Sequence, residues 1–154
     1  MRVATAFGEV DIPDEVVLHF PAGIYGFPQL RRGCLLPYGA TSGLRWLQSL
    51  DEPSLVFLTV EPYLVFPGYE ADLPEYDAEA LELTAPSEAA IVTLVTISAE
   101  SEAVTTNLLA PIVINTRTRC ARQIVLDSDC YLTRHLIGGE IKDDFHAGLS
   151  AEDW

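Results

Sequence analysis

The sequence predicts a mainly β protein, a small antiparallel β-barrel or sandwich-like single domain with one or two short helices. Two patterns indicate this fold. Apolar residues recur at alternate positions over short runs, and glycine, proline and aspartate turn formers separate these runs. The length of 154 residues fits one domain, which at this size hides roughly 70% of the surface that an unfolded chain exposes. A sizeable core is therefore expected without disulfides.

The first half of the chain contains most of the expected strands. Val3, Thr5 and Phe7 would share one face of a strand, and Val10 and Ile12 follow after Gly8 and Glu9, which predicts a strand pair over 3–7 and 10–12. Further strands, each bounded by turn formers, are expected over residues 16–20, 34–38, 44–49 and 54–60. Such closely spaced short strands favour an antiparallel barrel or sandwich.

One helix is expected to interrupt the strands, over residues 72–83. Asp72 is placed to cap its start, Glu75 three residues later completes a capping-box pattern, and Pro74 suits the first turn. The residues expected on its inner side are Tyr76, Ala80 and Leu83. The remaining positions are largely acidic, which predicts a solvated outer face.

The second half begins with the longest apolar run, residues 89–98. Its residues are apolar or threonine on both faces, so we expect a central strand covered on both sides. Residues 104–115 predict a strand interrupted at Pro111, because proline cannot donate to a strand ladder. A turn over 115–119 and a returning strand over 122–126 complete a hairpin. We assign residues 1–137 to the β-barrel domain and 138–154 to an acidic, mobile C-terminal tail.

Charge is distributed unevenly along the chain. The net charge is −14, and no lysine or arginine occurs between Arg45 and Arg117. Twelve acids occur in this base-free segment: Asp51, Glu52, Glu61, Glu70, Asp72, Glu75, Asp77, Glu79, Glu82, Glu88, Glu100 and Glu102. Repulsion among these carboxylates lowers stability, so such a segment is easier to understand if an electropositive partner approaches it. An acidic surface that only maintains solubility remains an alternative.

The same composition argues against two classes of partner. Direct nucleic-acid binding requires clustered cations, and the chain has only nine lysines and arginines. No run of apolar residues is long enough for a membrane span, and the N-terminus lacks the features of a signal peptide. A cytoplasmic protein without direct nucleic-acid or membrane contacts is therefore expected.

The sequence contains no convincing pattern of catalytic, metal-binding or cofactor-binding residues. Cys34, Cys120 and Cys130 lack metal-site spacing, and the three histidines are dispersed. The glycines in residues 20–27 lack the order of a phosphate-binding loop. We expect no catalytic residues, metal or cofactor and hence no enzyme, while a small β-barrel enzyme or flavin binder remains the alternative function.

Two groups of residues are candidates for partner binding. Residues 62–69 form an apolar and aromatic loop that leads directly into acids, as at a protein interface with an apolar centre. The candidates there are Phe66, Tyr69, Glu70, Asp72 and Glu75, and Phe27 and Trp46 are further possible anchors. Arg117, Arg119 and Arg122 form a second group, which either makes internal salt bridges or contacts an acidic partner from another face.

Four blocks of sequence occur in a fixed order: FPAGIYGF at 20–27, WLQSLDEPSLVFLTVEP at 46–62, NLLAPIVIN at 107–115 and RQIVL at 122–126. Together they resemble the flagellar assembly factor family FliW, and the resemblance extends from about Val3 to His135. Tyr25 is bulkier than expected in its turn, and Thr116 stands where proline is expected. Residues after Ile137 have no recognised counterpart.

The resemblance implies a β-barrel-like protein without known catalysis that binds two alternative partners. These are flagellin and the RNA-binding translational repressor CsrA. It further implies that the free protein binds the repressor away from its RNA groove and weakens its hold on flagellin mRNA allosterically. Flagellin that accumulates would then occupy the protein and release the repressor, which couples flagellin synthesis to secretion.

Overall fold

The computed structural model describes residues 1–39 and 41–138 of the chain. The strands are β1 (Arg2–Thr5), β2 (Gly8–Asp11), β3 (Leu18–His19), β4 (Arg32–Tyr38), β5 (Thr41–Ser49), β6 (Val56–Val60), β7 (Ala89–Ile97), β8 (Val104–Thr106), β9 (Ile112–Asn115), β10 (Ala121–Gln123) and β11 (His135–Leu136). The helices are α1 (Pro62–Val65), α2 (Glu75–Ala80) and two single-turn 3-10 helices, Asp14–Val16 and Pro86–Glu88. The predicted tail lies outside the described residues apart from Gly138.

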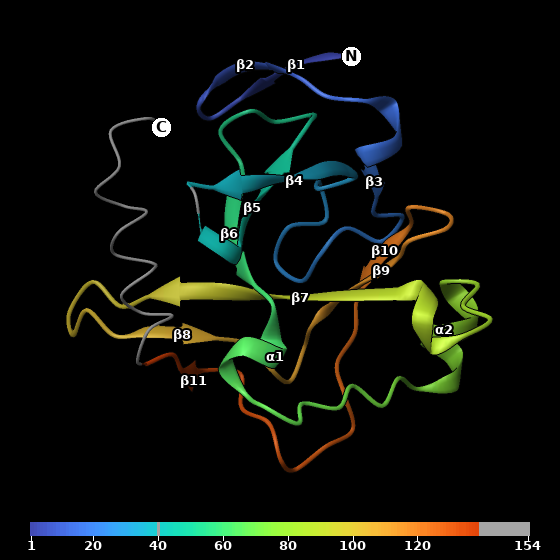
Figure 1. Cartoon of the computed structure of the whole chain (residues 1–154), viewed down its shortest axis with the longest axis vertical. Coiled ribbons are helices and arrows are strands. Elements are labelled where there is room, and N and C mark those ends of the chain that lie inside the picture. The colour runs from blue at the N-terminus through green and yellow to red at the C-terminus, as the bar shows by residue number, and fades with distance from the viewer. Residues whose placement is uncertain (40, 139–154) are drawn as a thin grey trace.

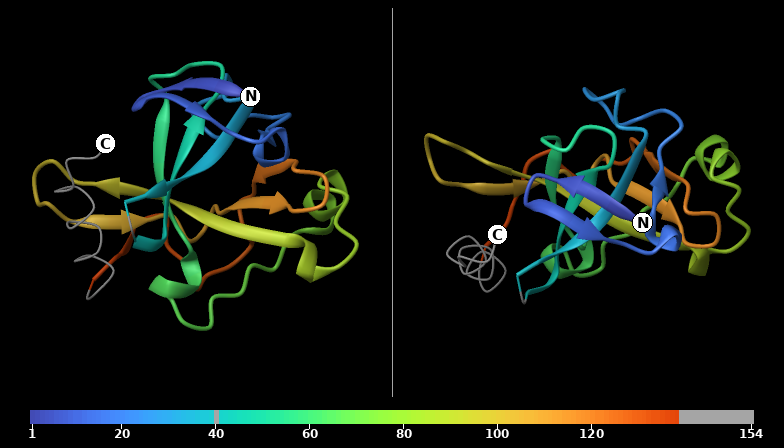
Figure 2. Two further views of the ribbon diagram at one scale, coloured as in Figure 1. Left: turned by 45° about the horizontal axis from the view of Figure 1, so that its top comes forward. Right: turned by 90° about the horizontal axis from the view of Figure 1, so that it is seen from above.

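The main sheet is antiparallel and curls into a half-barrel. Its neighbouring strands follow the order β10-β9-β7-β6-β5-β4-β3, and β8 and β11 extend it from β7. A bridge between His19 and Cys120 brings β3 against the end of the β9–β10 hairpin. The β1–β2 pair forms a separate small sheet at the end of the molecule opposite α1 (Figures 1 and 2). The mainly β prediction is confirmed.

Strand β7 connects three parts of the sheet. It pairs with β9 through residues 89–92, with β6 through Thr93 and Leu94, and with β8 through residues 95–97. Between β8 and β9 the chain leaves the ladder over 107–111, so the predicted interruption at Pro111 is confirmed. The carbonyl of Pro111 instead accepts a 3.0 Å hydrogen bond from the Ile124 amide.

The core occupies both sides of β9. Ile112 and Ile114 pack inside the curled sheet with Phe20 and Leu47, whereas Val113 points to a second cluster around Leu108. All four residues of β9 are buried. In β7 only Val92 and Thr93 are buried. The expectation that residues 89–98 form the strand covered on both faces is therefore wrong beyond its centre, because β9 occupies that position.

Two local predictions about helices are also wrong. The N-cap residue of α2 is Pro74, with φ −54° and ψ 142°, and no side chain caps the helix. Its carbonyl accepts hydrogen bonds from the amides of Asp77 and Ala78, each at 3.0 Å. Tyr76 and Ala80 are exposed, whereas Leu83 packs against the core as expected, and Leu81, 2% exposed, provides the main inner contact. The 62–69 segment, expected to be a loop, begins with the single turn of α1.

Candidate functional site

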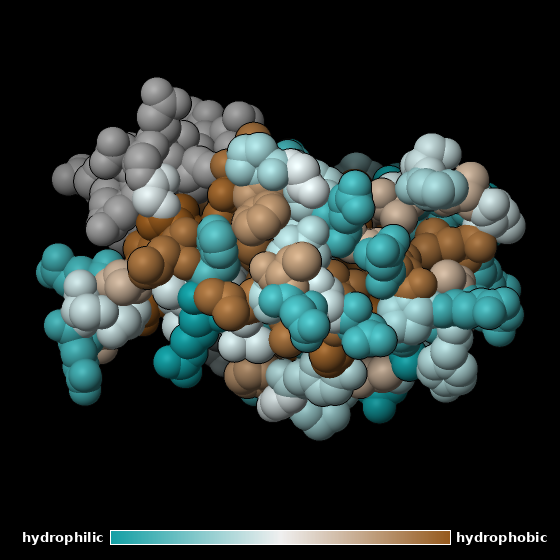
Figure 3. Space-filling view, turned by 90° about the horizontal axis from the view of Figure 1, so that it is seen from below, coloured by the Kyte–Doolittle hydropathy of each residue, from teal (hydrophilic) through white to brown (hydrophobic). Residues whose placement is uncertain are grey.

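A groove of about 510 Å³ lies between the chain after α1 and the chain around α2. One wall is formed by Tyr69 and residues 70–73, and the other by Ala78 and residues 83–86. Its floor includes Ala89 and Ile91 of β7. Figure 3 shows the molecule from the side of α1, where hydrophobic residues alternate with hydrophilic ones. The groove is therefore an apolar depression with a polar border.

The border of the groove is acidic. Glu70 and Asp72 line it and are exposed, and Glu75 is exposed at the start of α2. None of the three makes an ion pair within the described part of the chain, whose six ion pairs involve other carboxylates. The structure thus brings these three predicted residues into one region, and their charges remain free to attract a cationic partner.

The two aromatic candidates from the same segment serve mainly as core residues. Tyr69 is 3% exposed, and its hydroxyl donates a 2.6 Å hydrogen bond to the Leu108 carbonyl. Phe66 is half-buried and packs edge-on against Tyr131 with ring centroids 5.3 Å apart. The aromatic side chain exposed beside the groove is Tyr63, which is 50% exposed. Sequence reasoning overlooked Tyr63 because exposure inside a short apolar run has no clear pattern.

The other two suggested anchors also pack inward. Phe27 contacts Phe57 edge-on with centroids 4.8 Å apart, and it lies against the core inside the curled sheet. Trp46 is half-buried between Phe7 and Tyr38, each with ring centroids 5.2 Å from its own. Alternation in a strand places aromatic residues on the covered face as readily as on the open one, so sequence alone does not separate these roles.

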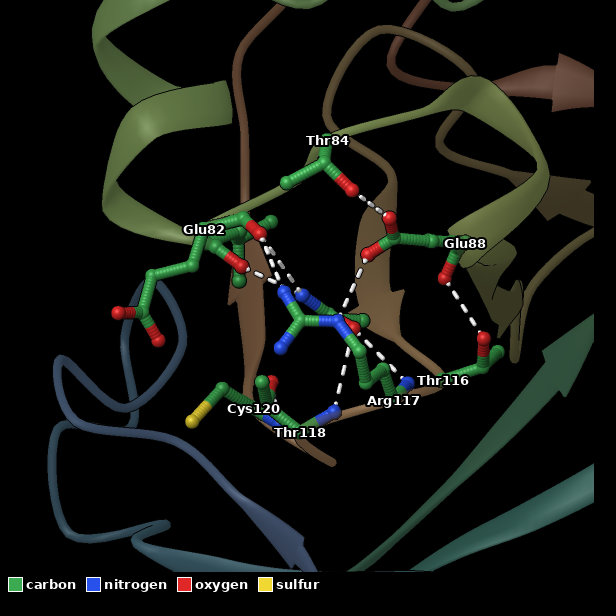
Figure 4. Close-up of polar contacts among 9 residues, drawn as sticks. Glu82, Thr84, Glu88, Thr116, Arg117, Thr118 and Cys120 are labelled. Atoms are coloured by element: carbon green, nitrogen blue, oxygen red, sulfur yellow. Dashed lines mark hydrogen bonds and ion pairs between the residues drawn. The ribbon is translucent and has the colours of Figure 1, made fainter.

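The β9–β10 hairpin holds the chain after α2 through a polar network (Figure 4). The buried amide nitrogen of Asn115 donates to the Leu81 carbonyl at 2.7 Å, and its oxygen accepts from the amides of Arg117 and Thr118. The Arg117 guanidinium donates to the Glu82 carbonyl at 2.9 Å. The hairpin therefore fixes the position of one groove wall.

Two of the hairpin arginines neutralise acids of that wall. Arg117 pairs with Glu88 at 3.2 Å, and Arg122 pairs with Asp77 at 2.8 Å. The Arg122 guanidinium also lies over the Tyr76 ring, 5.6 Å from its centroid. Internal salt bridges, one of the two roles expected from the sequence, thus account for these two arginines. Arg117 and Arg122 therefore face the acidic segment itself. Among the three hairpin arginines, only Arg119 makes no ion pair within the described part of the chain.

The hydrogen bonds around Glu88 alter its acidity. Its pKa lies below the ordinary value, first because the Thr84 hydroxyl donates a hydrogen bond to the carboxylate and then because Arg117 does. Its backbone carbonyl accepts hydrogen bonds from the amide and hydroxyl of Thr116 at 2.8 and 2.9 Å. Thr116, where the sequence pattern led us to expect proline, therefore supplies donors that proline lacks.

No group of three or more histidine, cysteine or acidic side chains in residues 1–39 and 41–138 is arranged to hold a metal ion. The cysteines are free, with Cys34 buried, Cys120 half-buried and Cys130 exposed. Among the described helices, none is long and apolar enough to cross a membrane. The groove is accordingly described by shape and charge alone.

Comparison with known proteins gives a consistent result. Residues 2–137 match the family model described as FliW protein. A flagellar assembly factor FliW of Heliobacterium modesticaldum is 40% identical over 136 residues, which cover 88% of this chain and 89% of the relative. A flagellar assembly factor FliW of Bacillus subtilis is 37% identical over 133 residues, which cover 86% of this chain and 93% of the relative.

The fold agrees with a solved structure of the same family. The crystal structure of a flagellar assembly factor FliW superposes with a TM-score of 0.80 and 33% sequence identity. The superposition covers 91% of this chain and 99% of that one. Sequence and architecture therefore agree over nearly the whole described chain, and this protein belongs to the FliW family.

Proposed function

We propose that this chain is a cytoplasmic flagellar assembly factor that acts by binding and has no enzymatic activity. In this proposal it binds flagellin and, alternatively, a CsrA-type RNA-binding repressor of translation. Binding weakens the repressor's hold on flagellin mRNA by an allosteric route. Flagellin that accumulates before export displaces the repressor, which then lowers further flagellin synthesis.

The observation that carries the proposal is the groove bordered by acids without ion pairs. An RNA-binding repressor must present cations to phosphates, and the groove presents the opposite charge through Glu70, Asp72 and Glu75. Electrostatic attraction can raise association rates by roughly 10- to 1,000-fold at low salt. The apolar floor at Ala89 and Ile91 then provides desolvated contact area, which determines how long a complex lasts.

Family membership supports the same proposal. The relatives named above are flagellar assembly factors, and the matched residues include both groove walls and the β9–β10 hairpin. Within the hairpin, Arg117 and Arg122 neutralise Glu88 and Asp77. Glu70, Asp72 and Glu75 have no such arginine partner, so in this proposal they give the repressor its target.

The test measures repressor association by surface plasmon resonance at several salt concentrations. One variant reverses the groove acids (Glu70→Lys, Asp72→Lys and Glu75→Lys), and a matched control reverses three exposed acids elsewhere (Asp11→Lys, Glu15→Lys and Asp129→Lys). Both variants change the net charge equally. We expect the groove variant to associate about tenfold more slowly than the control and to show a flatter salt dependence.

Equal rates for the two variants would remove the groove from the repressor interface. A second measurement adds purified flagellin to the preformed repressor complex. We expect flagellin to release the repressor in proportion to its concentration. Failure of the wild-type protein to bind either partner at micromolar concentration and moderate salt would refute the proposed function as a whole.

A further inference from the structure

A second concavity is lined by residues of β4, β7 and the β9–β10 hairpin. It consists of two adjoining hollows of about 370 and 200 Å³, which share Leu35, Ala90 and Ile114. Arg45, Glu61 and Tyr63 lie at one end, and Thr116 and Arg119 lie at the other. We call this concavity the trough. Its middle is apolar, and it adjoins the acidic groove, with which it shares Tyr63, Ala89 and Ile91.

The trough contains backbone groups of Ile91 that have no partner. The Thr116 amide donates to the Glu88 carbonyl at 2.8 Å, so residues 88, 90 and 92 direct their backbone groups toward β9. Ile91 therefore directs its N–H and C=O to the opposite edge of β7. Strand β6 covers that edge only at Thr93 and Leu94. No hydrogen bond to these two Ile91 groups occurs in the described chain.

Leu35 has the same arrangement on β4. The Leu50 amide donates to the Arg32 carbonyl at 2.9 Å, which fixes even-numbered residues of β4 as those that bond to β5. Leu35 thus directs its backbone groups to the outer edge, where β3 pairs only with Arg32 and Gly33. Both Leu35 and Ile91 are half-buried and line the trough. Two strand edges therefore leave unpaired donors and acceptors there.

Arg119 provides a cation at one end of the trough. It is half-buried, has φ +65°, and its side chain makes no ion pair within the described residues, unlike Arg117 and Arg122. Its backbone is held firmly, since its amide donates to the Asn115 carbonyl at 2.8 Å and its carbonyl accepts from His19 at 2.9 Å. The guanidinium can thus donate hydrogen bonds to a carboxylate at this end of the trough.

We propose that the trough binds an extended polypeptide segment of a partner protein as an added strand on the Ile91 edge of β7. The segment carries apolar residues at alternate positions and an aspartate or glutamate that pairs with Arg119. Strand addition satisfies the unpaired backbone groups, and alternate side chains supply specificity. The apolar ones contact Leu35, Ala90 and Ile114. An extended segment is favoured over a helix because only an extended backbone offers hydrogen bonds to a strand edge.

This inference goes beyond the proposed function, because it assigns a binding mode to the trough, which adjoins the acidic groove and shares Tyr63, Ala89 and Ile91 with it. The two can fail separately. Reversing the groove acids leaves the trough residues unchanged, and altering Arg119 leaves both the groove acids and the groove floor in place. A protein that binds the repressor normally but no extended peptide would overturn only the present inference.

The experiment uses a synthetic library of fluorescein-labelled ten-residue peptides in which valine or leucine alternates with threonine. Each peptide is made in one version with a single aspartate and one with a lysine at that position. Binding is measured by fluorescence polarisation, and amide hydrogen exchange is followed by NMR. We expect bound peptides to protect the Ile91 amide and to favour aspartate over lysine by about tenfold, since a charge-assisted hydrogen bond replaces repulsion.

Three variants sharpen the test. Ile91→Pro removes the free donor without removing a β7–β9 hydrogen bond, and we expect binding to weaken about tenfold or more. Arg119→Gln should abolish the preference for aspartate, whereas Arg134→Gln, an exposed arginine outside the trough, should keep it. Arg119→Gln also serves as the informative variant if Ile91→Pro does not fold.

Any of three results would overturn the inference. The first is that no peptide binds at millimolar concentration. The second is that peptides bind without protecting the Ile91 amide, and the third is that Arg119→Gln retains the preference for aspartate. Protection of Ile91 that rises with protein concentration in the absence of peptide would assign the edge to a second copy of this chain, which also contradicts the proposal.

Discussion

Tyr63 and Tyr69 are neighbours in sequence and space but have opposite environments. Their ring centroids are 5.9 Å apart, yet Tyr63 is 50% exposed and Tyr69 is 3% exposed. Burial raises the pKa of the Tyr69 hydroxyl well above its ordinary value. The same hydroxyl satisfies the buried Leu108 carbonyl. Tyr69 therefore links the groove wall to the core, and Tyr63 is free to meet a partner.

The two tyrosines give a matched pair of stability predictions. Tyr69→Phe leaves the Leu108 carbonyl without its donor and should lower the free energy of unfolding by about 1–2 kcal/mol. Tyr63→Phe should change it by less than about 0.5 kcal/mol, because its hydroxyl is at the surface. Urea titration followed by circular dichroism measures both. Equal losses would show that the Tyr69 hydrogen bond contributes nothing beyond side-chain burial.

Glu88 should make stability depend on pH. Because its pKa is lowered in the folded state, the ionised form stabilises the fold above the ordinary pKa of 4.5, and that contribution is lost as the pH falls through the folded value. Glu88→Gln should therefore lose less stability between pH 7 and pH 3 than the wild type does. Urea titrations across this range test it, with the exposed Glu100→Gln as control. Parallel curves for wild type and Glu88→Gln would contradict the prediction.

At the scale of elements, helix α1 is positioned by close contact with the start of β5. Gly43 has φ +88°, and a Cβ atom built there would overlap the Leu64 side chain. The Gly43 carbonyl also accepts a 2.9 Å hydrogen bond from the Glu61 amide, just before α1. Glycine is therefore required at this position for two reasons, backbone conformation and space. The contact holds Tyr63, at the junction of groove and trough, in place.

Two glycines separate these reasons experimentally. Gly68 has φ +85° but open space around it, so Gly68→Ala should cost only the conformational strain, about 1 kcal/mol. Gly43→Ala should cost that strain plus a smaller increment, because only the end of the exposed Leu64 side chain must also move. Adding Leu64→Ala to Gly43→Ala should recover part of that excess. Thermal unfolding of the three variants checks this; a larger loss for Gly68→Ala would disprove the steric argument.

The strands were predictable from local pattern, and the helix boundaries were not. Residues 34–38 and 54–60 are short apolar runs bounded by turn formers, and β4 and β6 occupy nearly those positions. The predicted cap at Asp72 failed because Pro74, with its fixed φ, begins α2 through its own carbonyl. The prediction of which α2 residues face inward was inaccurate for a related reason. A helix of six residues is oriented by what it packs against, so Leu81 at its end decides its rotation.

The sequence indicated the acidic residues that border the groove, but it did not indicate which aromatic residues are exposed beside it. Glu70 and Asp72 follow an apolar segment in sequence, which is why the acidic border could be recognised. The pairing of Arg122 with Asp77 joins residues 45 positions apart, and no local pattern reveals such a distance. The same applies to the Ile91 edge, whose free backbone groups depend on where β6 leaves β7.

For the whole molecule, the net charge of −14 opposes folding through like-charge repulsion. The acids near the groove contribute to this repulsion, because the hairpin arginines pair with Asp77 and Glu88 and leave Glu70, Asp72 and Glu75 unpaired. Under the proposed function, the surface that would attract a cationic partner therefore lowers the stability of the free protein. Stability and binding are linked through the same charges.

This linkage predicts the effect of salt. Raising the ionic strength from about 10 to about 200 mM should increase the melting temperature, because the screening length falls from about 30 to below 10 Å. Neutralising the groove acids (Glu70→Gln, Asp72→Asn and Glu75→Gln) should raise the melting temperature at low salt and reduce its dependence on salt. Differential scanning calorimetry measures both effects. A melting temperature that falls with added salt would show that attractive pairs dominate instead.

The position of β7 in the sheet has a consequence for folding during synthesis. A growing chain that ends after residue 97 already contains β4, β5 and β6 and can pair β7 through Thr93 and Leu94. Its other edge stays open until β8 and β9 are made, and β3 meets its bridge at Cys120 later still. Because domains fold cooperatively as units, ribosome-bound chains should become protease-resistant only after the β9–β10 hairpin leaves the exit tunnel.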